Sequence, residues 1–279
     1  DAGFQGFAAL MGTELPATVI ARCYTSPGVF SSALSVCENG EDHGTAVAEA
    51  VVGLAPDVTL YIAGPFSKGD LQAIAAWMVS EGVAVINQSL SWTWDGPGDG
   101  TSPFNSSPLS AVDTAVAGGT IWVNSAGNGA QDNWYGSYKD TNGNGFIEFT
   151  LGASELNSVQ LSAGDLLKAQ ARWDDSWTAA SRDFDLALYD SNLILVAASA
   201  NFQEGLLGQT PYEQILYTAP ATGTYHLALV HFAGSVPSWL QLKAEDLSVS
   251  VAGNSIVNPA ESANSGMLVL PMTIPPASL

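Results

Sequence analysis

Basic residues are scarce in this chain of 279 residues, in which 7 Lys and Arg stand against 27 Asp and Glu and give a formal net charge of −20. So acidic a chain repels a phosphate backbone and anionic lipid headgroups, so we expect no nucleic-acid partner and no attraction to anionic membranes. Long apolar runs are missing as well, and no stretch reaches the roughly 20 residues of a membrane-spanning helix. The first residues do not have the pattern of a signal peptide, so any targeting segment is expected to lie outside this chain.

Cysteine and histidine are also few. Cys23 and Cys37 lie in a stretch rich in Ser, Gly and Pro, which we interpret as a loop. One loop-closing disulfide and two free thiols are both open readings, whereas a zinc site is not expected because no histidine lies near them at ligand spacing. Any histidine chemistry must come from His43, His226 or His231.

Apolar residues are abundant: 47% of the residues are hydrophobic and 12% are charged, a composition that excludes disorder. Its first half alternates helical and strand patterns, typical of an α/β layer with a buried parallel sheet. We predict helices over 45–54, 70–80 and 108–117, and strands over 58–63, 83–87 and 120–124.

After Gly136 the pattern changes to short strands separated by turn residues, which predicts an antiparallel β-sandwich of about 100 residues. The predicted strands are 159–163, 166–173, 184–189, 193–198, 214–218 and 223–230. His226 and His231 are five apart on or just after one strand and fall on opposite faces, so a shared metal is not expected. Trp134, Trp173, Trp177 and Trp239 either form a binding surface or pack into the fold, and packing is favoured.

His43 comes directly before an alanine-rich helix. The positive end of a helix dipole disfavours imidazolium, and a neutral imidazole is what a general base requires. The alternative is a histidine that only caps the helix.

Two further segments follow predicted buried strands. The run Asn124–Gly129 could present a side-chain amide to a developing oxyanion, or it could be an ordinary Asn/Gly turn. The run Asn87–Ser91 could pair with an extended peptide by strand addition, or simply end a strand.

Together with Asp1-Ala2-Gly3, the segments HGTAVAEAVVGLAPDVTLYIA, VAVINQSLSW and TIWVNSAGNGA resemble, in this order, the motifs of the subtilisin-like serine peptidases, the subtilases. The resemblance covers about the first 130 residues. It implies that Asp1 orients the imidazole and that His43 is the general base. It also implies that Asn128 donates to the oxyanion and that Ser89, Leu90 and Ser91 pair with the substrate backbone.

The nucleophile of the family is missing. Subtilases carry it in a Gly-Thr-Ser-x-Ala segment after the oxyanion Asn, and no such segment follows Asn128. Ser102, in Gly100-Thr101-Ser102-Pro103, precedes the oxyanion strand in a loop with no helix starting at it, so we do not assign it as the nucleophile. Residues 255–270 resemble the subtilase segment that returns to the sheet, so we expect the nucleophile beyond Leu279 and this chain to be inactive alone.

The predicted organisation is an α/β, subtilisin-like peptidase core, incomplete at both ends, interrupted by an antiparallel β-sandwich. The core spans 1–145, the inserted sandwich 146–252, and the return into the core 253–279. The sandwich resembles the pre-peptidase C-terminal type of domain through residues 183–190 and 217–225.

Residues Asp140, Asn142 and Asn144 resemble the start of a calcium loop, with Gly145 at the sixth position. Leu151 stands at the twelfth position instead of Glu, so an EF-hand is not supported, and an ordinary Asn/Gly turn is the alternative. Hydrolysis would require no cofactor, and calcium is the one metal that the sequence suggests.

The leading hypothesis is a secreted or extracellular serine endopeptidase acting on protein or peptide substrates. The rival is a secreted, non-catalytic binding or spacer module (a pseudopeptidase) that acts through the sandwich. The sequence carries no signal of oligomeric state.

Overall fold

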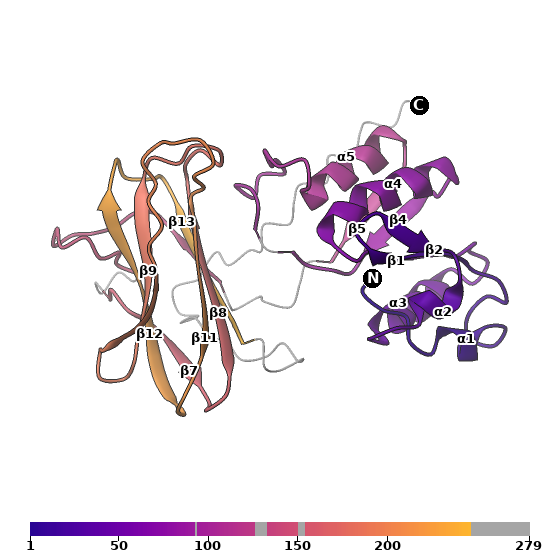
Figure 1. The fold of residues 1–279 in the computed structure, drawn as a ribbon, viewed down its shortest axis with the longest axis horizontal. Helices are drawn as coiled ribbons and strands as arrows, with labels where there is room; N and C mark the ends of the chain where they lie inside the picture. Colours follow the sequence, from indigo (N-terminus) through magenta and orange to yellow (C-terminus); the bar gives the residue numbers. More distant parts are fainter. Residues whose placement is uncertain (93, 126–132, 150–153, 247–279) are drawn as a thin grey trace. The chain divides into compact units, whose positions relative to one another are not determined.

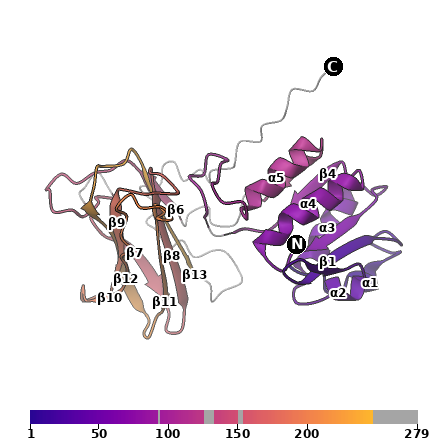
Figure 2. The ribbon, with the colours of Figure 1, turned by 45° about the horizontal axis from the view of Figure 1, so that its top comes forward.

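The computed structural model describes residues 1–92, 94–125, 133–149 and 154–246 (Figure 1, Figure 2). The chain divides into two compact units, each with its own core. Unit 1 comprises Asp1–Asp95 and Phe104–Gly127, and unit 2 comprises Gly96–Pro103 and Asn128–Leu279.

The described part of unit 1 alternates strands and helices, as predicted. In chain order its elements are α1 (Phe7–Leu10), β1 (Ile20–Ser26), β2 (Val29–Ser31), α2 (Leu34–Cys37), α3 (His43–Leu54), β3 (Tyr61–Gly64), a 3₁₀ turn (Lys68–Asp70), α4 (Leu71–Ser80), β4 (Val85–Gln88), α5 (Pro108–Ala117) and β5 (Ile121–Asn124).

Parallel pairing defines the sheets of unit 1. β1 pairs with β3 in parallel and β4 pairs with β5 in parallel, while β2 is added antiparallel to β1. The described strands thus form two sheets, in the orders β2-β1-β3 and β4-β5. The prediction of a parallel α/β layer is confirmed at this level.

Helices cover the β1–β3 sheet on both sides, because successive side chains of a strand point to opposite faces. Ala21 and Ile62 pack with Ala48 of α3 in one cluster, whereas Tyr24 and Ala63 belong to the cluster built on α4 and α5. Figure 2 shows α4 and α5 side by side against β4.

The prediction that β4 and β5 are fully buried strands is wrong. Ile86 and Trp122 are buried under α4 and α5, but Val85, Ile121 and Val123 are 52%, 57% and 40% exposed. An unbroken apolar run is therefore compatible with a sheet that is covered on one face.

Local chemistry sets the helix ends. The side chain of Ser107 accepts a hydrogen bond from the backbone N–H of Leu109 and Pro108 is the first helical residue, which together begin α5. Gly82 and Gly119, at φ 75° and 80°, follow the ends of α4 and α5, where glycine adopts the left-handed conformation without strain. Among the helices in the described ranges, none is long and apolar enough to cross a lipid bilayer.

The stretch around the two cysteines is not the loop that its composition suggested. Cys23 lies in β1, Cys37 is the last residue of α2, and the two form a disulfide. The Ser, Pro and Gly residues that hid the strand make the β1–β2 hairpin turn, where Gly28 has φ 74°.

The described part of unit 2 is an antiparallel sandwich of two four-stranded sheets, in the orders β10-β9-β12-β7 and β11-β8-β13-β6. Trp173, Phe184, Leu229 and other fully buried side chains fill the space between the sheets. The strands are β6 (Asn133–Gly136), β7 (Asn157–Leu161), β8 (Leu166–Trp173), β9 (Asp183–Tyr189), β10 (Leu195–Ser199), β11 (Tyr212–Thr218), β12 (Gly223–Ala233) and β13 (Leu240–Asp246).

The sandwich begins earlier than the predicted boundary at 146. β6 pairs with β13, so residues 133–136 are part of the sandwich instead of the peptidase core. The loop Gly96–Pro103 also belongs to unit 2. Residues 253–279, predicted to return to the core, lie outside the described residues.

Candidate functional site

The carboxylate of Asp1 and the imidazole of His43 meet at the start of α3. Nδ1 of His43 lies 3.1 Å from Oδ1 and 3.0 Å from Oδ2 of Asp1. The Asp1 side chain is 5% exposed and that of His43 is 55% exposed. A carboxylate at Nδ1 favours the tautomer that carries its proton there, which leaves Nε2 as the nitrogen able to accept a proton.

The backbone of Asp1 is also fixed. Its backbone nitrogen donates to the carbonyl of Ala63 in β3 at 2.9 Å. The backbone N–H of Ala2 donates to Oδ1 of Asp1 at 2.7 Å. The position of the Asp1 carboxylate is therefore fixed by backbone hydrogen bonds as well as by its contact with the imidazole.

Two glycines allow the Asp1 segment and α3 to approach so closely. The N–H of Gly44 donates to the carbonyl of Gly3 at 2.9 Å. A Cβ added at Gly44 would lie 2.4 Å from that carbonyl oxygen, and a Cβ at Gly3 would lie 2.5 Å from the carbonyl oxygens of Asn39 and Glu41. The sequence HGT therefore places glycine where the two backbones touch.

The predicted substrate segment follows directly on β4. Ser89 and Leu90 are half-buried and Ser91 is exposed, and Ser89 accepts a hydrogen bond from the side-chain amide of Asn87 at 3.0 Å. Among the described strands β4 pairs only with β5. The segment lies at a strand end, as predicted, and its pairing with a peptide stays a prediction.

The third predicted catalytic group, Asn128, lies outside the described residues. The structure follows this strand as far as Ser125, whose N–H donates to the carbonyl of Gln88 at 2.9 Å. Of the three groups expected to converge, the structure brings Asp1 and His43 together.

Ser102 belongs to unit 2, whereas His43 belongs to unit 1. The next helix in the chain, α5, begins only at Pro108. Ser102 therefore lacks the helix start that the family's nucleophile would have.

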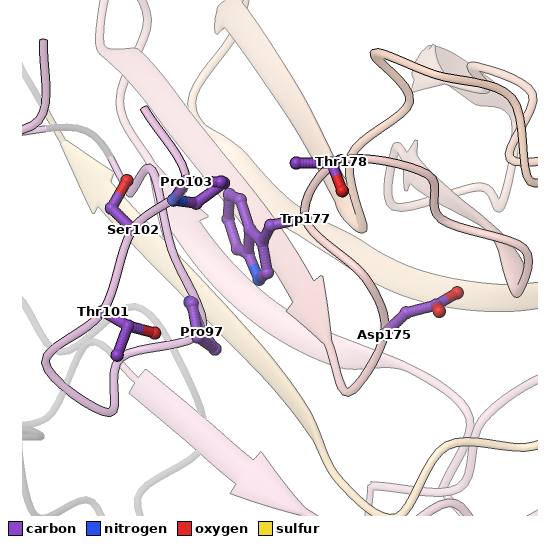
Figure 3. Close-up of a pocket in the computed structure, with 7 residues that line it drawn as sticks. All are labelled: Pro97, Thr101, Ser102, Pro103, Asp175, Trp177 and Thr178. Atoms are coloured by element: carbon purple, nitrogen blue, oxygen red, sulfur yellow. The ribbon is translucent and has the colours of Figure 1, made fainter. Parts of the chain in front are cut away.

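The loop Gly96–Pro103 and the turn 175–178 line a shallow, open cleft of about 380 Å³ in unit 2 (Figure 3). Pro97, Pro103 and the buried ring of Trp177 line it, and the indole Nε1 of Trp177 has no hydrogen-bond partner among the described residues. Its carboxylate, Asp175, accepts the backbone N–H groups of Ser181 and Arg182, each at 2.7 Å. The carboxylate is thus committed to the fold, and the cleft offers no evident general base.

Sequence reasoning missed Arg172, which holds this loop. It is 4% exposed, and its Nη1 donates to the carbonyl of Gly96 at 2.8 Å. Burial lowers the pKa of Arg172 to about 10. Nothing in the local sequence around an arginine on β8 indicates a partner 76 residues earlier.

Glu213 is a second buried charge that the sequence did not reveal, and its exposed fraction is 0%. Burial raises the pKa of its carboxyl, while the hydroxyl of Ser199 and the side-chain amide of Gln203 donate to it. Because these donors are neutral groups at the end of β10 and in the loop that follows it, Glu213 anchors that loop.

Hydrogen bonds join residues of the candidate calcium loop to one another and to Glu155. Oδ1 of Asp140 accepts the N–H of Gly143 at 2.8 Å, and the side-chain amides of Asn142 and Asn144 each donate to Glu155 at 2.8 Å. In the ranges that the structure covers, no group of three or more His, Cys, Asp or Glu residues gathers as a metal site. Calcium binding at Asp140, Asn142 and Asn144 stays a prediction.

The remaining histidines and tryptophans of the sandwich contact other residues of the same unit. His226 contacts Ser158 at 2.9 Å, and His231 stacks on the buried ring of Phe184 at 4.8 Å between ring centres. Trp134 and Trp173 are core residues, which confirms that packing explains them. Trp239 stacks on Tyr135 at 5.7 Å between ring centres.

The comparisons agree with the geometry of unit 1. Residues 33–147 match the model of the subtilase family (Peptidase_S8), the family of serine peptidases that the sequence resembles. The match includes His43 and Ser89–Ser91. None of the curated proteins matches the chain.

Among the solved structures similar to part of the chain, three are small domains. They are the pre-peptidase C-terminal domain of collagenase from Bacillus anthracis (8% identity, 40% of this chain and 87% of that chain, TM-score 0.27), the K3 cleaved adhesin domain of Lys-gingipain from Porphyromonas gingivalis w83 (16%, 40% and 89%, 0.23) and CBM35 from Paenibacillus barcinonensis (14%, 42% and 94%, 0.22). The first is of the type that the sequence resembled.

Proposed function

We propose that unit 1 is the base-bearing part of a serine endopeptidase of the subtilase type that hydrolyses peptide bonds in extracellular proteins. The observation that carries the proposal is the contact of Nδ1 of His43 with the Asp1 carboxylate at 3.0 Å, at the start of a helix inside the subtilase segment. In this arrangement the carboxylate fixes the tautomer and Nε2 is the base.

The proposed chemistry is acyl transfer. A serine hydroxyl gives its proton to Nε2 of His43 as its oxygen attacks the peptide carbonyl, and His43 then gives that proton to the leaving amine. Asp1 stabilises the imidazolium that forms in between. Asn128 would donate to the oxyanion, and Ser89–Ser91 would align the substrate backbone beside β4.

The serine would come from a Gly-Thr-Ser-x-Ala segment, which the 279 residues do not contain. We therefore propose that the chain by itself does not turn over peptides. The hydrolysis needs no cofactor, because the three side chains and the oxyanion donor supply all of its proton and charge chemistry.

A secreted location is part of the proposal. The disulfide between Cys23 and Cys37 supports it, because disulfides persist in oxidising compartments and are rare in the cytosol.

The test compares two proteins: the chain as it stands, and the chain extended by the native sequence that follows Leu279. Both are assayed on an unstructured protein substrate. We expect no turnover by the first and turnover by the second, which His43→Ala should reduce at least about 10³-fold. His226→Ala, in the sandwich, is the matched control and should leave the rate unchanged.

Turnover by the unextended chain, surviving His43→Ala, would contradict the assignment of His43. A native frame without a Gly-Thr-Ser-x-Ala segment would instead favour the non-catalytic binding or spacer module.

A further inference from the structure

The segment that carries Asp1 lies along the segment that leads into His43, and backbone hydrogen bonds join them. The N–H of Phe4 donates to the carbonyl of Cys37, and the N–H of Gln5 donates to that of Glu41, each at 3.0 Å. The N–H of Gly44 returns to the carbonyl of Gly3 at 2.9 Å. We call residues 37–44 the cradle, because they hold residues 3–5 on both sides of the contact between Gly3 and Gly44.

Two side-chain hydrogen bonds also join the segment that follows Asp1 to the cradle and to the first turn of α3. The hydroxyl of Thr45 donates to the carbonyl of Gln5 at 3.0 Å, and Glu38 accepts the N–H of Ala8 at 2.8 Å. The position of the Asp1 carboxylate relative to His43 therefore depends on where the cradle runs.

The disulfide fixes the first residue of the cradle. Cys37 is 1% exposed and bonded to Cys23, which is 3% exposed in the middle of β1. A Cβ added to Gly64, at the end of β3, would lie 3.2 Å from the sulfur of Cys23 and 3.5 Å from the carbonyl oxygen of Asp1. The sulfur bridge thus lies beside the strand end on which Asp1 is held.

Residues 38–42, between the bridge and His43, belong to no helix or strand. Without the bridge, the cradle would begin at the end of the four-residue helix α2, which is too short to be stable by itself. The covalent link to β1 is what ties this end of the cradle to the sheet.

We propose that the disulfide Cys23–Cys37 is a positioning element for the Asp1–His43 pair: it holds the cradle on the sheet and thereby sets the carboxylate against Nδ1. The importance of this pair rests on the proposed function. The positioning itself can be measured without any peptidase activity.

The experiment reads the tautomer of His43 by long-range proton–nitrogen NMR, at a pH where the three imidazoles are neutral. A free imidazole prefers its proton on Nε2, whereas a carboxylate at Nδ1 holds the proton on Nδ1. Three protein forms are compared: the native disulfide form, the dithiol form and the Cys23→Ala/Cys37→Ala variant. The dithiol form is made with dithiothreitol, which passes two electrons and two protons to the bridge and becomes a cyclic disulfide.

We expect the native form to show His43 protonated on Nδ1, and Asp1→Asn to abolish that signature and so assign it. Opening the bridge, by either route, should return His43 to the Nε2 tautomer. It should also speed amide exchange at Phe4, Gln5 and Gly44 at least about tenfold, through local opening, while the amides of α4 and α5 exchange as before.

Val52→Ala is the matched control, because Val52 lies on α3 and belongs to the same buried core cluster as the two cysteines, and its truncation leaves the bridge intact. It should lower stability and leave the His43 tautomer unchanged. An unchanged tautomer after the bridge is opened would overturn the proposal, and so would faster exchange throughout unit 1, which would show general stabilisation only. A negative result in the peptidase assay would contradict the proposed function but not the positioning role of the disulfide, which the NMR experiment tests separately.

Discussion

Arg172 and Gly96 lie 76 residues apart in sequence, and Nη1 of the arginine donates to the glycine carbonyl at 2.8 Å. Nε of Arg172 donates to Gln241 on the neighbouring strand β13, also at 2.8 Å. A buried cation keeps its hydrogen bonds because water cannot replace them. The loop 96–103 is therefore a fixed part of the sandwich unit.

Arg172→Met should lower the free energy of unfolding by about 1–3 kcal/mol, because it leaves the Gly96 carbonyl and the Gln241 amide oxygen without this donor. Urea unfolding followed by tryptophan fluorescence measures the change. Lys168→Met on the same strand removes a more exposed cation that lies 3.7 Å from Glu245, and should cost at most about 1 kcal/mol. Equal losses for the two variants would contradict the role given to Arg172.

Gly98→Ala should destabilise the same unit. Gly98 has φ 86°, and a Cβ there would lie 2.6 Å from Nη2 of Arg172. Gly164, at φ 96°, has open space around it, so Gly164→Ala measures the backbone strain alone, about 1–2 kcal/mol. We expect Gly98→Ala to cost more than Gly164→Ala in urea unfolding, and the reverse order would refute the close contact.

Gly44→Ala should separate Asp1 from His43, since its Cβ would lie 2.4 Å from the Gly3 carbonyl oxygen and 2.8 Å from the ring of Phe4. Loss of the Nδ1-protonated tautomer of His43 in NMR spectra is the measurement. Gly53→Ala in the same helix meets no atom within 4 Å and should stabilise the helix by about 0.5–1 kcal/mol, with the tautomer kept. A Gly44→Ala protein with an unaltered tautomer would show that the backbones need not touch.

Glu148 links stability to pH. The hydroxyl of Thr141 and the ammonium of Lys139 lower the pKa of Glu148 from 4.5 to about 2. A depressed pKa stabilises the fold fully above the unfolded value of 4.5, and this contribution is lost as the pH falls toward 2. Glu148→Gln should therefore destabilise the chain at neutral pH, and the difference from the native chain should shrink on acidification.

Urea unfolding at a series of pH values tests this, with the exposed Glu81→Gln as the control that should show no such trend. A destabilisation by Glu148→Gln that is constant from neutral to acid pH would mean that the carboxylate's charge contributes nothing.

Calcium should bind the 140–145 loop weakly, with a dissociation constant on the order of 10⁻³ M, because two of the three expected ligands are neutral amides. The Asp140 carboxylate also already accepts backbone N–H groups. Chemical-shift titration of the Gly143 and Gly145 amides measures it, and Asp140→Ala should abolish the shifts. Micromolar affinity, or shifts that survive Asp140→Ala, would contradict this expectation.

Elements with strong local signals could be predicted from the sequence. The helix predicted over 108–117 is α5 itself, because Ser107 and Pro108 start it and Gly118-Gly119 follow it. The strand β1 was missed because hairpin residues dominate its surroundings. β13 was missed although its alternation could be read: Leu240, Leu242 and Ala244 are all 0% exposed and alternate with polar residues.

The residues of the candidate site also differ in how far the sequence could predict them. Asp1 and His43 are brought together by hydrogen bonds between segments some forty residues apart, which no spacing rule predicts, and only the likeness to a family pointed to the pair. Arg172 and its loop are joined over a longer separation still, without any such likeness. Contacts of this kind depend on how the whole backbone folds, so local sequence patterns do not reveal them.

The uncovered side of the β4–β5 sheet has a consequence for how the chain behaves in concentrated solution. Val85, Ile121 and Val123 present an apolar strip to water, and like strips attract one another. At neutral pH the net charge of −20 keeps copies apart by mutual repulsion. Acidification removes that repulsion and leaves the strip in place, so colloidal stability should fall on the acid side.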